Sequence, residues 1–193
     1  TGQTERQIWY DRITMSVAVA ESGGDLRGAL AEIVVMLDDD GPVLLHQRRL
    51  LLQAAAIIAE LRAEGDDTAA VSERVAAAWA AQPAQLLADS WSPIVEALLP
   101  PSDPALQRAI DVAEGDDVPV VFRVITRLER ARLLLRTGDR TAAGMLLAEA
   151  ATIARTLGHA RLTTTVTTFA HAAGLSLDPV RGDSAATASA SDP

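Results

Sequence analysis

Residues 121–158 read VFRVITRLERARLLLRTGDRTAAGMLLAEAATIARTLG, and this stretch decides the fold. On both sides of the pair Gly138-Asp139, apolar residues recur every three or four positions, which is the period of a helix with one buried face. The two apolar stripes consist of Val121, Val124, Leu128, Ala131 and Leu135, and of Ala143, Leu146, Ala150, Ile153 and Leu157. Glycine suits the left-handed residue just past a helix end, and aspartate suits the N-cap of the next helix. The stretch therefore predicts two helices joined by a tight turn.

The same Gly-Asp pair lies at three more predicted joints between helices, at Gly24-Asp25, Gly65-Asp66 and Gly115-Asp116. In three of the four joints an alanine lies five residues after the glycine, early in the second helix. These alanines are Ala29, Ala70 and Ala143. A small side chain at this position lets two helices approach closely. The joints therefore predict repeated helix pairs that bury their apolar faces against one another.

The spacing of prolines supports a repeat in the first half of the chain. Pro42 and Pro83 lie equally far after the glycines of the first two joints, which predicts a unit of 41 residues. At the joint that lacks the alanine, we expect Gly115 to end one unit and Pro119 to lie in the first turn of the next helix. The proline-rich segment 82–104 interrupts the regularity. It is compatible with a hinge or a binding insertion, but an ordinary connection between helices is the simpler interpretation.

Helical periodicity covers most of the remaining chain. The first of the two helices above extends over about Val118–Thr137, and we expect further helices at Glu5–Glu21, Leu26–Leu37, Val43–Glu64, Thr68–Ala81, Ile94–Leu99, Ala105–Glu114 and Ala160–Ala173. The β-branched run 163–168 is also compatible with a strand, but the spacing of Leu162, Val166 and Phe169 favours a helix. The sequence thus predicts an all-α fold of stacked antiparallel helix pairs, an α-solenoid, over residues 1–177. Residues 178–193 are small and polar, which predicts a disordered tail or linker.

Composition and charge exclude several classes of function. A net charge of −9 repels the phosphate backbone of nucleic acids. No stretch approaches the roughly 20 apolar residues of a membrane span, and the first residues lack a signal-peptide pattern. The absence of cysteine excludes disulfides and thiolate ligands. We therefore expect a cytoplasmic protein that contacts neither nucleic acid nor a membrane.

The usual signatures of catalysis and metal binding are missing. The histidines, His46, His159 and His171, have no histidine or glutamate four residues away. The acidic run 38–41 does not match a calcium loop, because Met36 and Gln47 occupy the positions of its first and last ligands. With no lysine in the chain, a P-loop is excluded. We expect no catalytic residue, no metal and no cofactor, and therefore a protein that is not an enzyme.

Four residues are candidates for a partner-binding or effector-binding site. Arg123, Arg127 and Arg130 share one helix face, and such a row can bind an anion or an acidic partner. A solvated helix flank paired with Glu129 and nearby acids is the simpler interpretation, since all seventeen basic residues are arginines and reflect a GC-rich genome. Trp91 lies in the proline-rich segment. It can fill the core or line a groove, because aromatic residues are enriched at binding hot spots.

Residues 127–158 resemble a tetratricopeptide repeat, and six residues occupy its small and large packing positions: Ala131, Leu134, Gly138, Ala143, Leu147 and Ala150. The aromatic packing positions of that motif are missing. The wider layout, with LLRTGDRTAA and ATIARTLG followed by a Thr/Leu-rich helix and a polar linker, is similar to large LuxR-type ATP-dependent transcriptional regulators. In that family such repeats lie between an N-terminal ATPase and a C-terminal helix-turn-helix domain.

The resemblance implies a tetratricopeptide-like module that is the sensor and oligomerisation segment of such a regulator, without its ATPase or DNA-binding domain. It would bind a protein partner or a small effector, with homo-oligomers possible. Two alternatives stay open. One is a structural protomer whose apolar faces serve only self-association. The other is a small helical enzyme that uses a buried pair of carboxylates in a cavity between helices.

Overall fold

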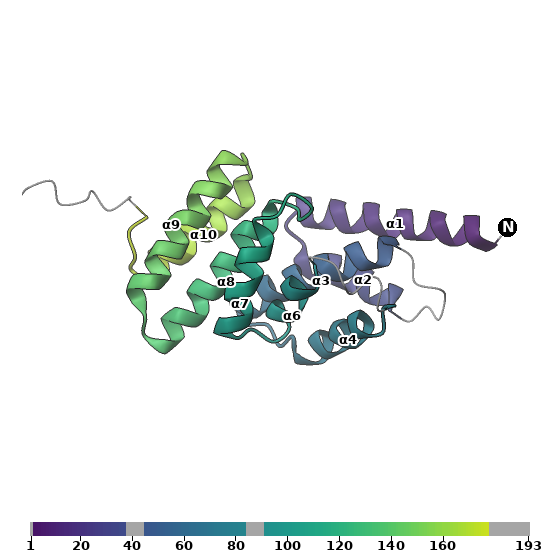
Figure 1. The fold of residues 1–193 in the computed structure, drawn as a ribbon. Coiled ribbons are helices and arrows are strands. Elements are labelled where there is room, and N and C mark those ends of the chain that lie inside the picture. The colour runs from purple at the N-terminus through teal and green to yellow at the C-terminus, as the bar shows by residue number, and fades with distance from the viewer. Residues whose placement is uncertain (1, 38–44, 84–90, 178–193) are drawn as a thin grey trace, which may run out of the picture.

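The computed structural model describes residues 2–37, 45–83 and 91–177, and every regular element in these ranges is a helix (Figure 1). The helices are α1 (Gly2–Ser22), α2 (Leu26–Met36), α3 (Leu45–Glu64), α4 (Ala69–Ala80), α6 (Ser92–Leu98), α7 (Asp103–Ala113), α8 (Val121–Thr137), α9 (Arg140–Thr156) and α10 (Ala160–Ala172). The all-α prediction is confirmed for these residues, and the helix bounds agree to within a few positions. In the described part of the chain, no helix combines the length and the apolar character needed to cross a membrane.

Two of the Gly-Asp joints have the predicted geometry. Gly24 and Gly138 have φ values of 81° and 92°, in the left-handed region that favours glycine. The carboxylate of Asp25 accepts the backbone N–H of Gly28, and that of Asp139 accepts the N–H of Ala142. The glycine thus ends one helix, and the aspartate caps the free N–H groups of the next.

The joint at Gly65-Asp66 departs from this pattern. Gly65 has the expected positive φ, but the carboxylate of Asp66 accepts hydrogen bonds from Nε and Nη2 of Arg27, at 2.7 Å each. Thr68, and not Asp66, is the N-cap residue of α4, which begins one residue later than predicted, at Ala69. Ala70 is exposed, so the prediction of a close helix contact there is wrong, whereas Ala29 and Ala143 are fully buried.

The joint between α9 and α10 lies where the sequence predicts it, but it has a histidine in place of the aspartate. Gly158 has a φ of 65°, and the Nδ1 atom of His159 accepts the backbone N–H of Leu162 at 3.4 Å. The helix that follows contains the threonine run. Its hydroxyls donate to carbonyls one turn back, as Thr163 does to His159 and Thr167 to Thr163. These bonds satisfy the hydroxyls of Thr163 and Thr167 within a helix despite β-branching.

Helix α3 lies at the centre of the first half of the molecule. Residues 54–61 are all buried, and α3 contacts α1, α2, α4 and α6. A helix that is covered on all sides is a core helix and not an amphipathic surface helix. Helix α4 adds the buried face Val75 and Trp79. Figure 1 shows α9 and α10 at one end of the molecule and the start of α1 at the other.

The proline-rich segment contains a helix of the core. Ile94, Val95 and Leu98 of α6 are buried, and α6 contacts α3, α7 and α8. The start of this segment at Gln82 and Pro83 is described, but residues 84–90 lie outside the described residues. The same holds for Pro42 and the acidic run 38–41, and for the expected tail at 178–193.

Candidate binding groove

A groove of about 720 Å³ lies where the end of α7 meets α8 and α9. Two of the four predicted site residues, Arg123 and Arg127, line it. The other lining residues are Glu114, Ala148, Glu149, Thr152, Ile153, Arg155 and Leu177. The groove therefore combines arginines and glutamates with an apolar wall.

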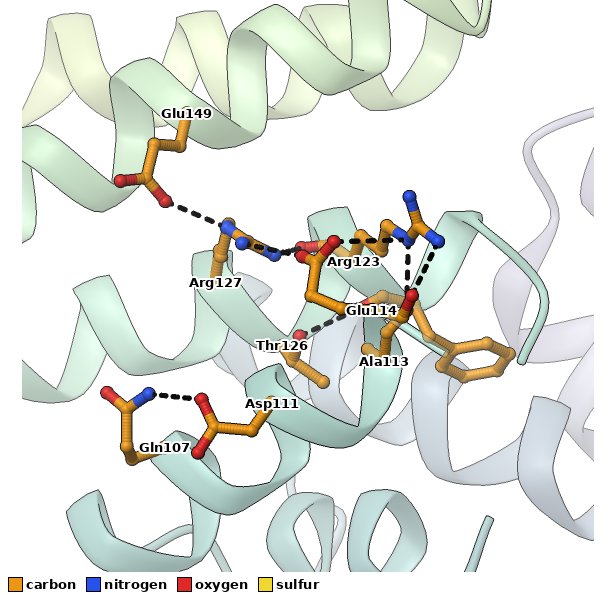
Figure 2. Close-up of polar contacts among 9 residues, drawn as sticks. Gln107, Asp111, Ala113, Glu114, Arg123, Thr126, Arg127 and Glu149 are labelled. Atoms are coloured by element: carbon orange, nitrogen blue, oxygen red, sulfur yellow. Dashed lines mark hydrogen bonds and ion pairs between the residues drawn. The ribbon is translucent and has the colours of Figure 1, made fainter. Parts of the chain in front are cut away.

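Arg127 is the central residue of the groove (Figure 2). Its Nη2 atom lies 2.7 Å from Glu114 Oε1 at the end of α7, and its Nε atom lies 2.9 Å from Glu149 Oε2 on α9. The side chain of Arg127 is only 11% exposed, whereas both glutamates are about half exposed. A guanidinium can bind two carboxylates at once because its N–H groups point in fixed, different directions. Arg127 thus connects three helices.

Arg123 binds the C-terminal end of α7. It donates hydrogen bonds to the carbonyl oxygens of Ala113 and Glu114 at 3.0 and 2.9 Å (Figure 2). These are among the last carbonyls of α7, which have no partner within the helix and carry partial negative charge. The Nε atom of Arg123 also lies 3.6 Å from a carboxylate oxygen of Glu114. Arg123 and Arg127 therefore hold the same glutamate from two sides.

Arg130 does not line this groove, although it shares the helix face. It forms an ion pair with Asp103 at 2.8 Å and a hydrogen bond with Gln107, both on α7. Glu129, the acid expected beside the three arginines, is buried and pairs with Arg132 instead. Burial raises the pKa of Glu129 above its ordinary value of 4.5, although the charges of Arg132 and Arg62 act in the opposite direction.

Trp91 lies apart from the arginines, immediately before α6. Its indole N–H donates to the carbonyl oxygen of Asp117 at 3.2 Å, in the connection between α7 and α8. The guanidinium carbon of Arg48 lies 5.7 Å from its ring centroid, within the range of a cation–π contact. The structure therefore brings Arg123 and Arg127 together, and places Arg130 and Trp91 elsewhere.

Arg155 and Leu177 are groove residues that the sequence analysis missed. In the described part of the chain, Arg155 forms no ion pair; its bonds go to the carbonyl oxygen of Ala151 and, at 3.5 Å, to the hydroxyl of Thr152. The apolar wall consists of Ala148, Ile153 and Leu177. The only sequence signal for Arg155 is its place on the helix after the Gly138-Asp139 joint, facing back toward α8.

The comparisons of this chain with protein-family models, curated proteins and solved structures found no match. Within the described residues, no group of three or more histidine, aspartate or glutamate side chains is placed to hold a metal ion. The groove presents three guanidinium groups, two carboxylates and an apolar wall.

Proposed function

We propose that this chain is a non-catalytic binding module, and that the groove between α7, α8 and α9 holds a segment of a partner protein. The observation that carries the proposal is a local excess of positive charge in an acidic chain. Three arginines face two glutamates in the groove, whereas the whole chain has a net charge of −9. A partner segment with an acidic residue next to an apolar one matches both the charge and the apolar wall.

Arg155 is the residue best placed to receive the partner's carboxylate, because Arg127 and Arg123 already hold Glu114 and Glu149. Those existing pairs fix the arginines before the partner arrives, so that little side-chain entropy is lost on binding. The apolar side chain of the partner would cover Ile153 and Leu177. A small acidic effector is the alternative occupant of the same groove.

We further propose that the helix pairs form a tetratricopeptide-like solenoid and belong to the sensor segment of a cytoplasmic LuxR-type transcriptional regulator. The support is the resemblance of residues 127–158 to that repeat and the direct contact of α8 with α9 across Gly138-Asp139. Because three helices line the groove, an occupant contacts all of them and biases their packing. Such a bias is how a sensor segment passes a signal to its neighbours.

Binding of short acetylated peptides, followed by fluorescence anisotropy, tests the groove. We expect a peptide that alternates Asp and Leu to bind more tightly than matched Lys/Leu and Asp/Ser peptides. Arg155→Glu should weaken binding by about tenfold or more, because it reverses the charge that receives the carboxylate. Arg108→Glu, an exposed arginine on α7 outside the groove, is the matched control. Equal binding of the Lys/Leu peptide, or an equal effect of the control variant, would contradict the proposal.

One observation favours the self-association alternative. Ile8, Met15 and Val19 follow one face of α1 and are 55%, 67% and 66% exposed. The opposite face of the same helix, with Tyr10, Ile13 and Val17, is buried in the core. An exposed apolar stripe of this kind suits a helix of a second molecule. Sedimentation over a range of concentrations tests this alternative, and a strict monomer removes it.

A further inference from the structure

A second cavity, separate from the groove, lies where four helices from distant parts of the chain meet. Its volume is about 260 Å³, slightly below the range of about 300–1,000 Å³ that is typical of ligand pockets. The end of α1, the middle of α3, the start of α8 and the start of α10 all contribute residues. The size suits a metabolite with few heavy atoms, and no residue is shared with the groove.

One face of α3 supplies half of the polar residues that line the cavity. The residues of α3 that form this face are spaced by four, three and four positions, so they lie on a single stripe of the helix. They are Arg49, Gln53, Ala56 and Glu60. Arg49 lies at one end of this stripe and Glu60 at the other. Polar groups of opposite charge are therefore spread along the length of the cavity.

The carboxylates at the cavity differ in their partners. Glu60 is buried and forms an ion pair with Arg161 of α10, so its charge is compensated. Glu21, at the end of α1, accepts a hydrogen bond from the side-chain amide of Gln53, which carries no charge. Burial raises the pKa of Glu21, although the amide of Gln53 and the charge of Arg161 act in the opposite direction. Glu21 thus lies in a site that penalises its ionised form.

Arg49 is the counterpart of Glu21. Its side chain is exposed at the cavity, and among the described residues it has neither a hydrogen bond nor an ion pair. In the ranges that the structure describes, Glu21 and Arg49 therefore each line the cavity without an ion-pair partner of their own. The same cavity has an apolar wall that includes the buried side chains Leu52, Phe122 and Ile125.

We propose that this cavity binds a small zwitterion with an apolar body, namely an aliphatic α-amino acid. Its ammonium group would pair with Glu21, its carboxylate with Arg49, and its side chain would cover Leu52 and Phe122. The ligand is neutral overall, as is the sum of the cavity's two carboxylates and two guanidinium groups. The partners of Glu21 and Glu60 argue against a catalytic carboxylate pair, because Arg161 and Gln53 already occupy oxygens of both.

Isothermal titration calorimetry of the full chain with three matched probes tests the ligand class. L-leucine carries both charged groups, isoamylamine is leucine without the carboxylate, and isocaproate is leucine without the ammonium. We expect L-leucine to bind about tenfold or more tightly than either partial ligand, since each of these leaves one protein charge unmatched. No binding of L-leucine, or equally tight binding of isoamylamine, would overturn the proposal.

Two variants test which protein side chain pairs with each charged group of the ligand. Glu21→Gln should weaken L-leucine and isoamylamine by about tenfold, whereas Arg49→Gln should weaken L-leucine by a similar factor and leave isoamylamine unchanged. Arg49 is exposed, so its variant tests the site even if Glu21→Gln is poorly folded. Glu96→Gln and Arg108→Gln, at exposed positions outside the cavity, are matched controls and should bind like the wild type. Equal losses in the controls would overturn the assignment.

Proton release is a readout that does not depend on the size of the affinity. An ammonium group beside Glu21 favours its ionised form, so binding should release protons in the pH range just above the ordinary carboxyl pKa. The groups facing Glu21 are Gln53 and Glu60 of α3 and His159 and Arg161 at the start of α10. Titrations in two buffers of different ionisation enthalpy should give different heats for the wild type and equal heats for Glu21→Gln. Equal heats for the wild type would contradict the role of Glu21.

Discussion

At the scale of single residues, the buried Glu129 has a consequence for the dependence of stability on pH. Its side chain is 2% exposed and its partner Arg132 is 9% exposed, so both charges have lost most of their water. Burial raises the pKa of Glu129 in the folded chain above its ordinary value of 4.5. Loss of water therefore outweighs the attraction of the nearby arginines, as is common for buried ion pairs.

We predict that Glu129→Gln makes the free energy of unfolding less dependent on pH. A carboxyl group with a raised folded pKa contributes stability that is fully present below the unfolded pKa and is lost as pH rises through the folded pKa. The free energy of unfolding of the wild type should therefore fall relative to the variant as pH rises from about 4.5. Urea denaturation of both proteins over this range measures the difference. A difference that does not change with pH would contradict the prediction.

At the scale of elements, the caps of α2 and α9 give a second prediction. Asp139→Ala removes the carboxylate that accepts the Ala142 N–H and should cost about 1 kcal/mol of stability. Asp116→Ala is the matched control, because Asp116 is exposed in the connection before α8 and caps none of the described helices. Thermal and urea unfolding of the two variants provide the measurement. A control that is destabilised as much as Asp139→Ala would show that the cap is not the cause.

The helices were predictable because periodicity and turn glycines are local signals. Gly24, Gly65 and Gly138 end helices as the sequence indicates, and the threonine run forms a helix because its apolar spacing is helical. The role of Asp66 was not predictable, since it depends on Arg27, which lies 39 residues earlier in the chain. The start of α10 at Ala160 was predicted correctly, but its His159 cap was not, because histidine is an unusual N-cap.

The binding groove was predictable only in part. Helical spacing correctly places Arg123, Arg127 and Arg130 on one face of α8, but it does not indicate which helices cover that face. Glu149 and Arg155 come from α9 and reach the groove only through the packing of α9 on α8. The cavity at Glu21 depends on still longer separations, because its lining spans residues 21–161.

At the scale of the whole molecule, one ion pair joins the two halves. Arg161 of α10 pairs with Glu60 of α3, which is 101 residues away in sequence. Glu60 is 8% exposed, whereas Arg161 is 32% exposed and keeps part of its water. Removal of the arginine therefore leaves a carboxylate that is buried and uncompensated.

We predict that Arg161→Gln lowers the free energy of unfolding by about 1–2 kcal/mol, less than for a fully buried pair because solvent screens the arginine. Arg155→Gln is the matched control, because Arg155 forms no ion pair in the described part of the chain. Amide hydrogen exchange should also show weaker protection of α10 in Arg161→Gln. Unchanged stability and protection would contradict a role for this pair in holding α10.

The tryptophans are distributed unevenly, and this gives the molecule a built-in optical reporter. Trp9 and Trp79 belong to α1 and α4, and Trp91 immediately precedes α6, so the helices from α6 to α10 contain no indole. Intrinsic emission therefore follows the packing of α1 and α4 and the contact of Trp91 with Asp117, whereas far-ultraviolet circular dichroism follows helices along the whole described chain. Matching midpoints from the two signals would mean that a single cooperative transition spans the chain, and a gap between them would reveal two separately melting bodies.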